Sequence, residues 1–117
     1  MKSVKDLDVF KLVHEMAIAI YKITKAFPEE EKFGLASQMR RAAYSVPMNL
    51  VEGAGRLNSR EYRQFVGIAR GSAAEVGYQL LLAKDLNCID DNTFQTGHTN
   101  YDRISQMLTK CFDSQMQ

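Results

Sequence analysis

The stretch SVPMNLVEGAGRLNSREYRQF, residues 45–65, contains the turn on which the predicted fold depends. Val46 and Leu50 are four positions apart, which is the spacing of apolar residues on one side of a helix. The segment GAGRLNS, residues 53–59, interrupts this period with glycines and polar residues. The stretch therefore predicts a helix, a short turn and a second helix.

The second of these helices has a clear start signal. Asn58 is followed three positions later by Glu61, which is the spacing of a capping box, and Ser59 alone is an alternative N-cap. The helix is predicted to run from Ser59 to about Leu86. Its expected buried stripe consists of Phe65, Ala69, Ser72, Val76, Leu80, Ala83 and Leu86.

The helix before the turn is predicted to begin at Phe33 or Gly34 and to run to about Gly53. Its expected stripe consists of Leu35, Met39, Ala42, Val46 and Leu50, with Ala43 and Val51 beside it. Pro47 lies inside this helix and removes a backbone donor from the carbonyl of Ala43. A bend near this point is therefore expected.

Polar residues after Pro47 are candidates for stabilising that bend. Asn49 and Glu52 can tie the bend and the following turn to a neighbour by hydrogen bonds. Gly53 and Gly55 are expected to end the helix, where a positive φ is needed. The segment GAGR lacks the GxxxxGK[ST] pattern and no strand precedes it, so a phosphate loop is not expected.

Two further helices flank this pair. The first is predicted from about Asp8 to Ala26 and ends at PEEE, residues 28–31, because Pro28 disfavours helical geometry at the residue before it. Its stripe is Val9, Val13, Met16, Ile20, Ile23 and Phe27. The last begins near Asp90, Asp91 and Asn92, with a stripe of Phe94, His98, Tyr101, Ile104, Leu108 and Cys111 or Phe112.

No stretch alternates with period two, so no sheet is expected. Four amphipathic helices with short connections predict an all-α fold, an antiparallel up-down-up-down four-helix bundle. The chain of 117 residues has the length of one domain, residues 1–117, with the second helix bent near Pro47.

Composition narrows the function classes. Fifteen basic and fourteen acidic residues give a formal charge of +1, so any basic site must be local. No apolar run approaches the roughly 18 residues of a membrane span, and we expect a cytoplasmic protein. Cys88 and Cys111 are too few and too far apart for a zinc pattern and are expected to be reduced thiols.

Catalytic and metal-binding patterns are not evident. A di-iron bundle would need Glu-x-x-His pairs, but Lys11 precedes His14 and Gln95 precedes His98 at that spacing. We expect His14 on the surface and His98 partly buried, with no metal or cofactor. No nucleophile motif stands out, and Glu52 is placed to pair with an arginine four residues on.

Arginines are the remaining candidates for binding. Along the third helix and the turn before it they recur at steps of four, three and seven, which predicts one side, and two more lie on the second helix. The candidates for nucleic-acid binding are Arg40, Arg41, Arg56, Arg60, Arg63 and Arg70. A solvated helix face is an equally weighted interpretation.

The third helix also carries Gly67, Gly71, Ala74 and Gly77. Each glycine weakens a helix by about 1 kcal/mol relative to alanine, so a compensating contact is expected. Close approach of another backbone would supply it, either inside the bundle or between subunits, and we favour self-association.

Residues 37–86 as a whole resemble the four helix bundle protein family first associated with intervening sequences inside bacterial 23S ribosomal RNA genes. The segment DLDVFKLVHEMAIAIYKITKAFPEEEKFGLASQMRRAA is similar to the family's first helix and turn. The matching motif positions are Gln38, Arg40, Arg41, Ala42, Ala43, Ser45, Asn49, Glu52, Gly53, Gly55, Arg56, Ser59, Glu61, Phe65, Ala69, Gly71, Ser72 and Glu75.

The resemblance implies a four-helix bundle, assembly into a ring expected to be a pentamer, and no enzymatic activity. A related branch, the accessory variability protein of diversity-generating retroelements, partners a reverse transcriptase and binds nucleic acid. The first hypothesis is therefore an oligomer whose arginines contact RNA or DNA phosphates. The alternative is a protein–protein assembly module or accessory subunit of a reverse transcriptase, whose arginines pair with Glu52, Glu61 and Glu75 within or between subunits.

Overall fold

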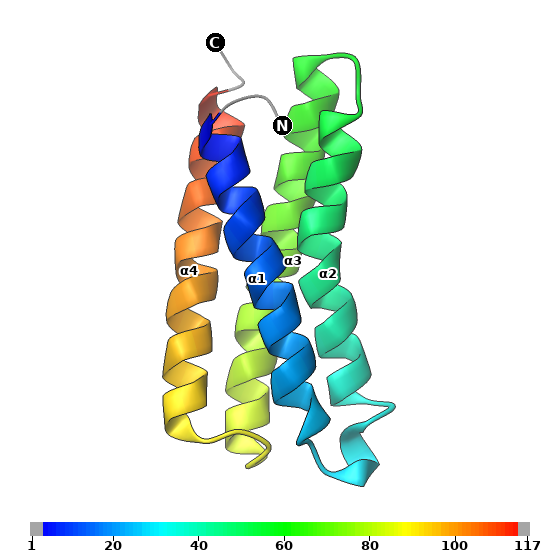
Figure 1. Ribbon diagram of the computed structural model, residues 1–117, viewed down its shortest axis with the longest axis vertical. Helices are drawn as coiled ribbons and strands as arrows, with labels where there is room; N and C mark the ends of the chain where they lie inside the picture. Colours follow the sequence, from blue (N-terminus) through cyan, green and yellow to red (C-terminus); the bar gives the residue numbers. More distant parts are fainter. Residues whose placement is uncertain (1–3, 115–117) are drawn as a thin grey trace.

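Four helices make up most of the computed structural model, which describes the backbone of residues 4–114 and the side chains from residue 7 onward (Figure 1). They are α1 (Val4–Lys25), α2 (Leu35–Ala54), α3 (Ser59–Asp85) and α4 (Asp91–Ser114), with a 3₁₀ turn η1 (Glu29–Glu31) before α2. Residues 4–114 contain no strand. The first and last three residues of the predicted domain 1–117 lie outside the described part.

The helices occupy the four corners of a bundle about 46 Å long. Helix α1 packs against α2 and α4, and α3 also packs against α2 and α4, whereas the backbones of the diagonal pairs stay more than 8 Å apart between Cα atoms. Successive helices run in opposite directions, so the α2–α3 turn lies at one end and the other two connections lie at the opposite end (Figure 1). The predicted antiparallel up-down-up-down bundle is confirmed.

Local hydrogen bonds explain where the helices begin and end. The Asn58 side chain accepts from the backbone N–H of Glu61 at 2.9 Å, which confirms the predicted cap of α3. Asn87 adopts φ of 61° just after α3, and the N–H of Cys88 donates to the carbonyl of Ala83 at 2.8 Å, as in a Schellman ending. Helix α1 begins at Val4, four residues before the predicted start at Asp8.

Helix α4 is capped by Asp90, whose side chain accepts from the N–H of Thr93 at 2.7 Å. That backbone hydrogen bond lowers the pKa of the Asp90 carboxyl, because it favours the charged form. The predicted start of the helix near this residue is therefore confirmed, and its cause is a charged N-cap.

The buried side of α3 differs in part from the predicted stripe. Phe65 and Ser72 are half-buried and Leu86 is exposed. The residues actually buried at helical spacing are Tyr62, Val66, Ala69, Ala73, Val76, Leu80 and Ala83. Ala69, Val76, Leu80 and Ala83 are therefore buried as predicted, whereas Val66 and Ala73 are buried in place of their predicted neighbours Phe65 and Ser72. The buried side of α3 lies between α2 and α4, because the helix packs against both.

The predicted buried stripe of α4 is also wrong at one position. His98, expected to be partly buried, is exposed, and the buried position belongs to Gly97 instead. A Cβ atom at Gly97 would lie 3.0 Å from Cδ1 of Leu80, so the glycine lets α3 and α4 approach closely. The rest of the predicted α4 stripe is buried or half-buried, with Cys111 buried and Phe112 half-buried.

Two other expectations concern the chemistry of the whole chain. His14 is exposed, as predicted, and Cys88 and Cys111 form no disulfide. Between residues 4 and 114, no helix combines the length and the apolar content needed to cross a membrane. In the same part of the chain, no three His, Cys, Asp or Glu side chains are grouped so that they could hold a metal ion.

Candidate binding face on helices α2 and α3

Helix α2 continues through Pro47, which is buried. The side-chain amide of Asn49 donates to the carbonyl of Ser45 at 2.8 Å and to its hydroxyl at 3.0 Å. The Ser45 hydroxyl also lies 3.1 Å from that of Ser72 on α3. The expected tie to a neighbouring helix is therefore present, but it passes from Asn49 through Ser45, while the bend at Pro47 stays a prediction.

The hydrogen-bond network of Asn49, Ser45 and Ser72 leaves one hydroxyl hydrogen available to a ligand. Ser45 and Ser72 each carry one hydroxyl hydrogen, and they share a single hydrogen bond. If Ser45 is the donor, the hydroxyl hydrogen of Ser72 has no acceptor among the described residues, and if Ser72 is the donor, the same holds for the hydrogen of Ser45. The carbonyl oxygen of the Asn49 amide is also not used, so a donor and an acceptor are both available there.

The hydroxyl pair lines a groove between α2 and α3 with a volume of about 610 Å³. We call it the α2–α3 groove; its lining consists of Gln38, Arg41, Ala42, Tyr44, Ser45, Met48, Asn49, Glu52, Phe65, Ser72 and Glu75. The charged side chains of the groove differ in their ion pairing. Glu52 pairs with Arg56 at 2.8 Å, whereas Arg41 and Glu75 have no ion pair with any described residue.

The two glycines of the turn were predicted to need positive φ, and this prediction is wrong. No glycine in residues 4–114 has a positive φ, and Gly55 has φ of −78°. Gly53 is buried inside α2, where a Cβ atom would lie 2.8 Å from Cβ of Phe65 and 3.3 Å from the carbonyl oxygen of Tyr62. Gly53 is therefore required for the close approach of α2 and α3.

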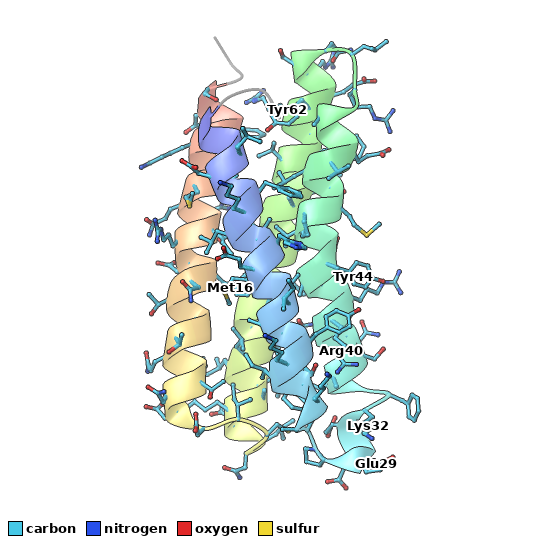
Figure 2. All side chains as sticks on the ribbon, viewed as in Figure 1. Met16, Glu29, Lys32, Arg40, Tyr44 and Tyr62 are labelled. Atoms are coloured by element: carbon cyan, nitrogen blue, oxygen red, sulfur yellow. The ribbon has the colours of Figure 1, made fainter. Side chains whose placement is uncertain are left out.

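The predicted arginine residues do not form one patch of available guanidinium groups. Arg40 faces α1, where its Nε donates to the Thr24 hydroxyl at 2.7 Å and its guanidinium lies 4.7 Å from the centre of the Tyr21 ring (Figure 2). A second nitrogen donates to the Tyr21 carbonyl at 3.2 Å. This arginine therefore holds α1 and α2 together.

Arg63 and Arg70 instead face α4. The guanidinium of Arg63 lies 4.0 Å from the centre of the Phe112 ring, and Nε of Arg70 donates to the Thr109 hydroxyl at 2.7 Å. Cation–π contacts of this kind contribute roughly 0.5–1 kcal/mol at exposed sites. The common side predicted from their spacing is thus largely occupied by intramolecular contacts.

The other three arginines are more accessible. Arg56 is held by Glu52 and lies 4.9 Å from the centre of the Phe65 ring. Arg41 and Arg60 are exposed and have no ion pair with any residue that the structure describes. The six predicted binding residues therefore lie on different sides of the bundle and do not form one continuous surface.

Sequence reasoning missed an apolar row on the outside of α2. Tyr44, Met48 and Val51 are exposed, although Val51 was predicted to border the core. Their spacing of four and three is itself a helical stripe, so the signal was present but was obscured by the stronger core stripe. On α3, Ile68 is exposed too. A Cβ atom built at Gly71 or Gly77 would have no heavy atom within 4 Å apart from those of its chain neighbours and of its own helix backbone.

Comparisons with known proteins agree with this architecture. The family model of the 23S rRNA-intervening sequence protein matches residues 5–110. The fold is similar to the crystal structure of a protein of unknown function from the S23 ribosomal protein family of Bacteroides thetaiotaomicron, with a TM-score of 0.87, 22% identity, and coverage of 94% of this chain and 99% of that chain. No curated protein matches the sequence. Since the matched residues span all four helices, the chain belongs to the 23S rRNA-intervening sequence protein family.

Proposed function

We propose that the protein is a non-catalytic assembly module that associates with further copies of itself through the outer face of α2 and α3. The observation that carries this proposal is the apolar row on α2, in which Met48 is 60% and Val51 is 55% exposed. Neighbouring large apolar side chains on a helix surface indicate a contact with another molecule. Tyr44 extends the row by one turn and adds an aromatic ring, a side chain enriched in protein interfaces.

The glycines of α3 support the same proposal. Gly71 is exposed and nothing inside the bundle compensates for its weaker helix propensity. Intramolecular packing, the other explanation considered for this residue, therefore lacks a contact. A second helix approaching this side of α3 would find room beside Gly71 and would cover Ile68, one turn away.

Charge complementarity favours a second copy as the occupant. Arg41 on α2 and Glu75 on α3 line the same groove without pairing with any described residue. If the Arg41 side of one subunit meets the Glu75 side of the next, each subunit offers one charge to each of its neighbours. Heterologous contacts of this kind between identical subunits can close into a ring.

Native mass spectrometry and light scattering test the proposal. The wild-type protein is expected to have the mass of several subunits, and five is the number that the resemblance implies. Met48→Lys should shift the mass toward the monomer, because it places a charge in the apolar row. Gln95→Lys adds the same charge on the exposed side of α4 and should leave the mass unchanged. A monomeric wild type, or a Met48→Lys variant with unchanged mass, would contradict the proposal.

A charge exchange tests the pairing between subunits. Arg41→Glu and Glu75→Arg should each weaken assembly, since each brings like charges together across the contact. The double variant should recover it. If the double variant is as weak as the single variants, the two residues do not face each other in the assembly.

Nucleic-acid binding is the second candidate function, and it is favoured by the guanidinium groups of Arg41 and Arg60, which are exposed and form no ion pair with a described residue. We expect Arg41→Ala and Arg60→Ala to weaken binding of a structured RNA at low salt, and each to reduce the salt slope by about 1. Arg103→Ala on α4 is the matched control. Fluorescence anisotropy that detects no RNA binding at low salt, or binding that does not depend on salt, would exclude this function.

A further inference from the structure

The connections at the two ends of the bundle differ in charge. Figure 1 shows the α2–α3 turn at one end, and η1 with the α3–α4 connection at the other, along the 46 Å axis. The turn between α2 and α3 together with the first two residues of α3, residues 55–60, carries Arg56 and Arg60 and no carboxylate, and Arg56 is paired with Glu52 of α2 at 2.8 Å. We call it the basic tip.

The opposite end, which we call the acidic end, consists of η1 and the α3–α4 connection. It contains six carboxylates against three lysines, namely Glu29, Glu30, Glu31, Asp85, Asp90 and Asp91 against Lys25, Lys32 and Lys84. Two of the lysines are already paired, Lys32 with Glu29 at 3.0 Å and Lys84 with Asp91 at 3.3 Å. Burial, followed by the charges of Glu31 and Glu30, raises the pKa of Cys88 in the α3–α4 connection, and Figure 1 shows that this connection and η1 lie at the same end of the bundle.

Each end also presents a large apolar side chain to solvent. Leu57 in the basic tip is 99% exposed, and Phe33 beside η1 is 93% exposed. These two are more exposed than any other large apolar residue whose burial is described. An isolated exposed apolar residue needs no explanation. Leu57 lies between Arg56 and Arg60 in the sequence, whereas Phe33 follows three glutamates and Lys32, so the two exposed side chains lie in connections of opposite net charge.

We propose that the basic tip of one copy docks on the acidic end of a second copy, so that the bundles associate end to end. Leu57 and Phe33 would cover each other, and Arg60, which has no ion pair with a described residue, would face Glu30. Both complementary surfaces belong to one chain, which favours a second copy over another partner. A head-to-tail contact of this kind does not close on itself and can repeat along an axis.

The size of the ends sets the strength of this contact. The bundle is 24 by 18 Å across. Even the whole cross-section therefore covers only about half of the ~800 Å² that each partner buries in a standard stable interface. The contact is therefore expected to be weak for single bundles. It gains strength if the lateral assembly proposed above aligns several tips in parallel, because the contacts then act together. The end-to-end contact itself does not depend on that assembly.

Sedimentation velocity at increasing protein concentration, up to about 1 mM because the contact is small, tests the proposal. The sedimentation coefficient should rise with concentration at low salt, and high salt should suppress the rise. Leu57→Ser and Phe33→Ser should each abolish it, and both side chains are exposed, so folding should be unaffected. A coefficient independent of concentration at low salt, or unchanged behaviour of both variants, would overturn the proposal.

A charge exchange identifies the partner surface. Arg60→Glu and Glu30→Arg should each abolish the rise, and the double variant should restore it; a double variant that fails to associate rules out this pairing. Arg103→Glu on α4 makes the same charge change away from both ends and should behave like the wild type. The lateral assembly is read separately, from the mass in dilute solution, which Leu57→Ser leaves unchanged and Met48→Lys lowers.

Discussion

Gly53 and Gly71 are the same residue type in neighbouring helices, yet their surroundings are opposite. At Gly53 a Cβ atom would lie 2.8 Å from Cβ of Phe65. At Gly71 a Cβ atom would have no heavy atom within 4 Å apart from those of its chain neighbours and of its own helix backbone. The first glycine is required by the packing of α2 on α3 within one chain. The second has no such requirement, so its explanation must be sought outside the single bundle or in the unfolded chain.

The largest effect is expected for Gly53→Ala. Its Cβ would meet another Cβ and the backbone of α3, which cannot move independently, so overpacking should exceed the gain in helix propensity. We expect a loss of about 2 kcal/mol in the free energy of unfolding, measured by urea denaturation. Unchanged stability would show that α2 and α3 are not as closely packed as the structure describes.

Gly71→Ala is expected to change stability in the opposite direction. The added methyl group meets nothing, and alanine favours the helix by up to about 1 kcal/mol. Urea denaturation of the monomeric Met48→Lys background should therefore show stabilisation. In the wild-type background the same change should weaken assembly, since it fills the space proposed for a second subunit. If Gly71→Ala stabilises the protein without changing the mass of the assembly, Gly71 faces solvent and not a second subunit.

Gly97→Ala lies between these two cases. Its Cβ would be 3.0 Å from Cδ1 of Leu80, which is the end of a flexible but fully buried side chain. Relaxation of Leu80 and the gain in helix propensity should leave a loss below about 1 kcal/mol, smaller than that of Gly53→Ala. Thermal unfolding of both variants under identical conditions gives the comparison; a larger loss at Gly97 would reverse the assigned order.

The smallest effect is expected for Gly55→Ala. Gly55 has φ of −78°, and its Cβ would make ordinary contacts at 3.5 and 3.6 Å with carbonyl oxygens of its own helix. The stability should remain within about 0.5 kcal/mol of the wild type, as for most surface substitutions. A strong loss in a denaturation experiment would indicate that the turn adopts a different backbone conformation in solution.

The candidate binding face was only partly predictable. Arg41 is a predicted binding residue and does line the α2–α3 groove. Asn49, Glu52 and Glu75 line it too, but the sequence predicts other roles for them, namely hydrogen bonds near the bend and ion pairs with arginines. The hydroxyl pair of Ser45 and Ser72 was not predicted, because it joins residues 27 positions apart on different helices. The arginine spacing indicated a side of α3, but it contained no information on whether Thr109 or Phe112 of α4 would occupy that side.

The sequence by itself determined the four helices, their antiparallel order and the cap at Asn58. These features depend on periodicity and on hydrogen bonds between residues a few positions apart, so they can be predicted within one segment. Only the tertiary structure decided why Gly53 is a glycine, which arginines are available and that Val51 faces outward. Each of these depends on the helix that lies opposite, and the distance and rotation of that helix are set by the packing of the whole core.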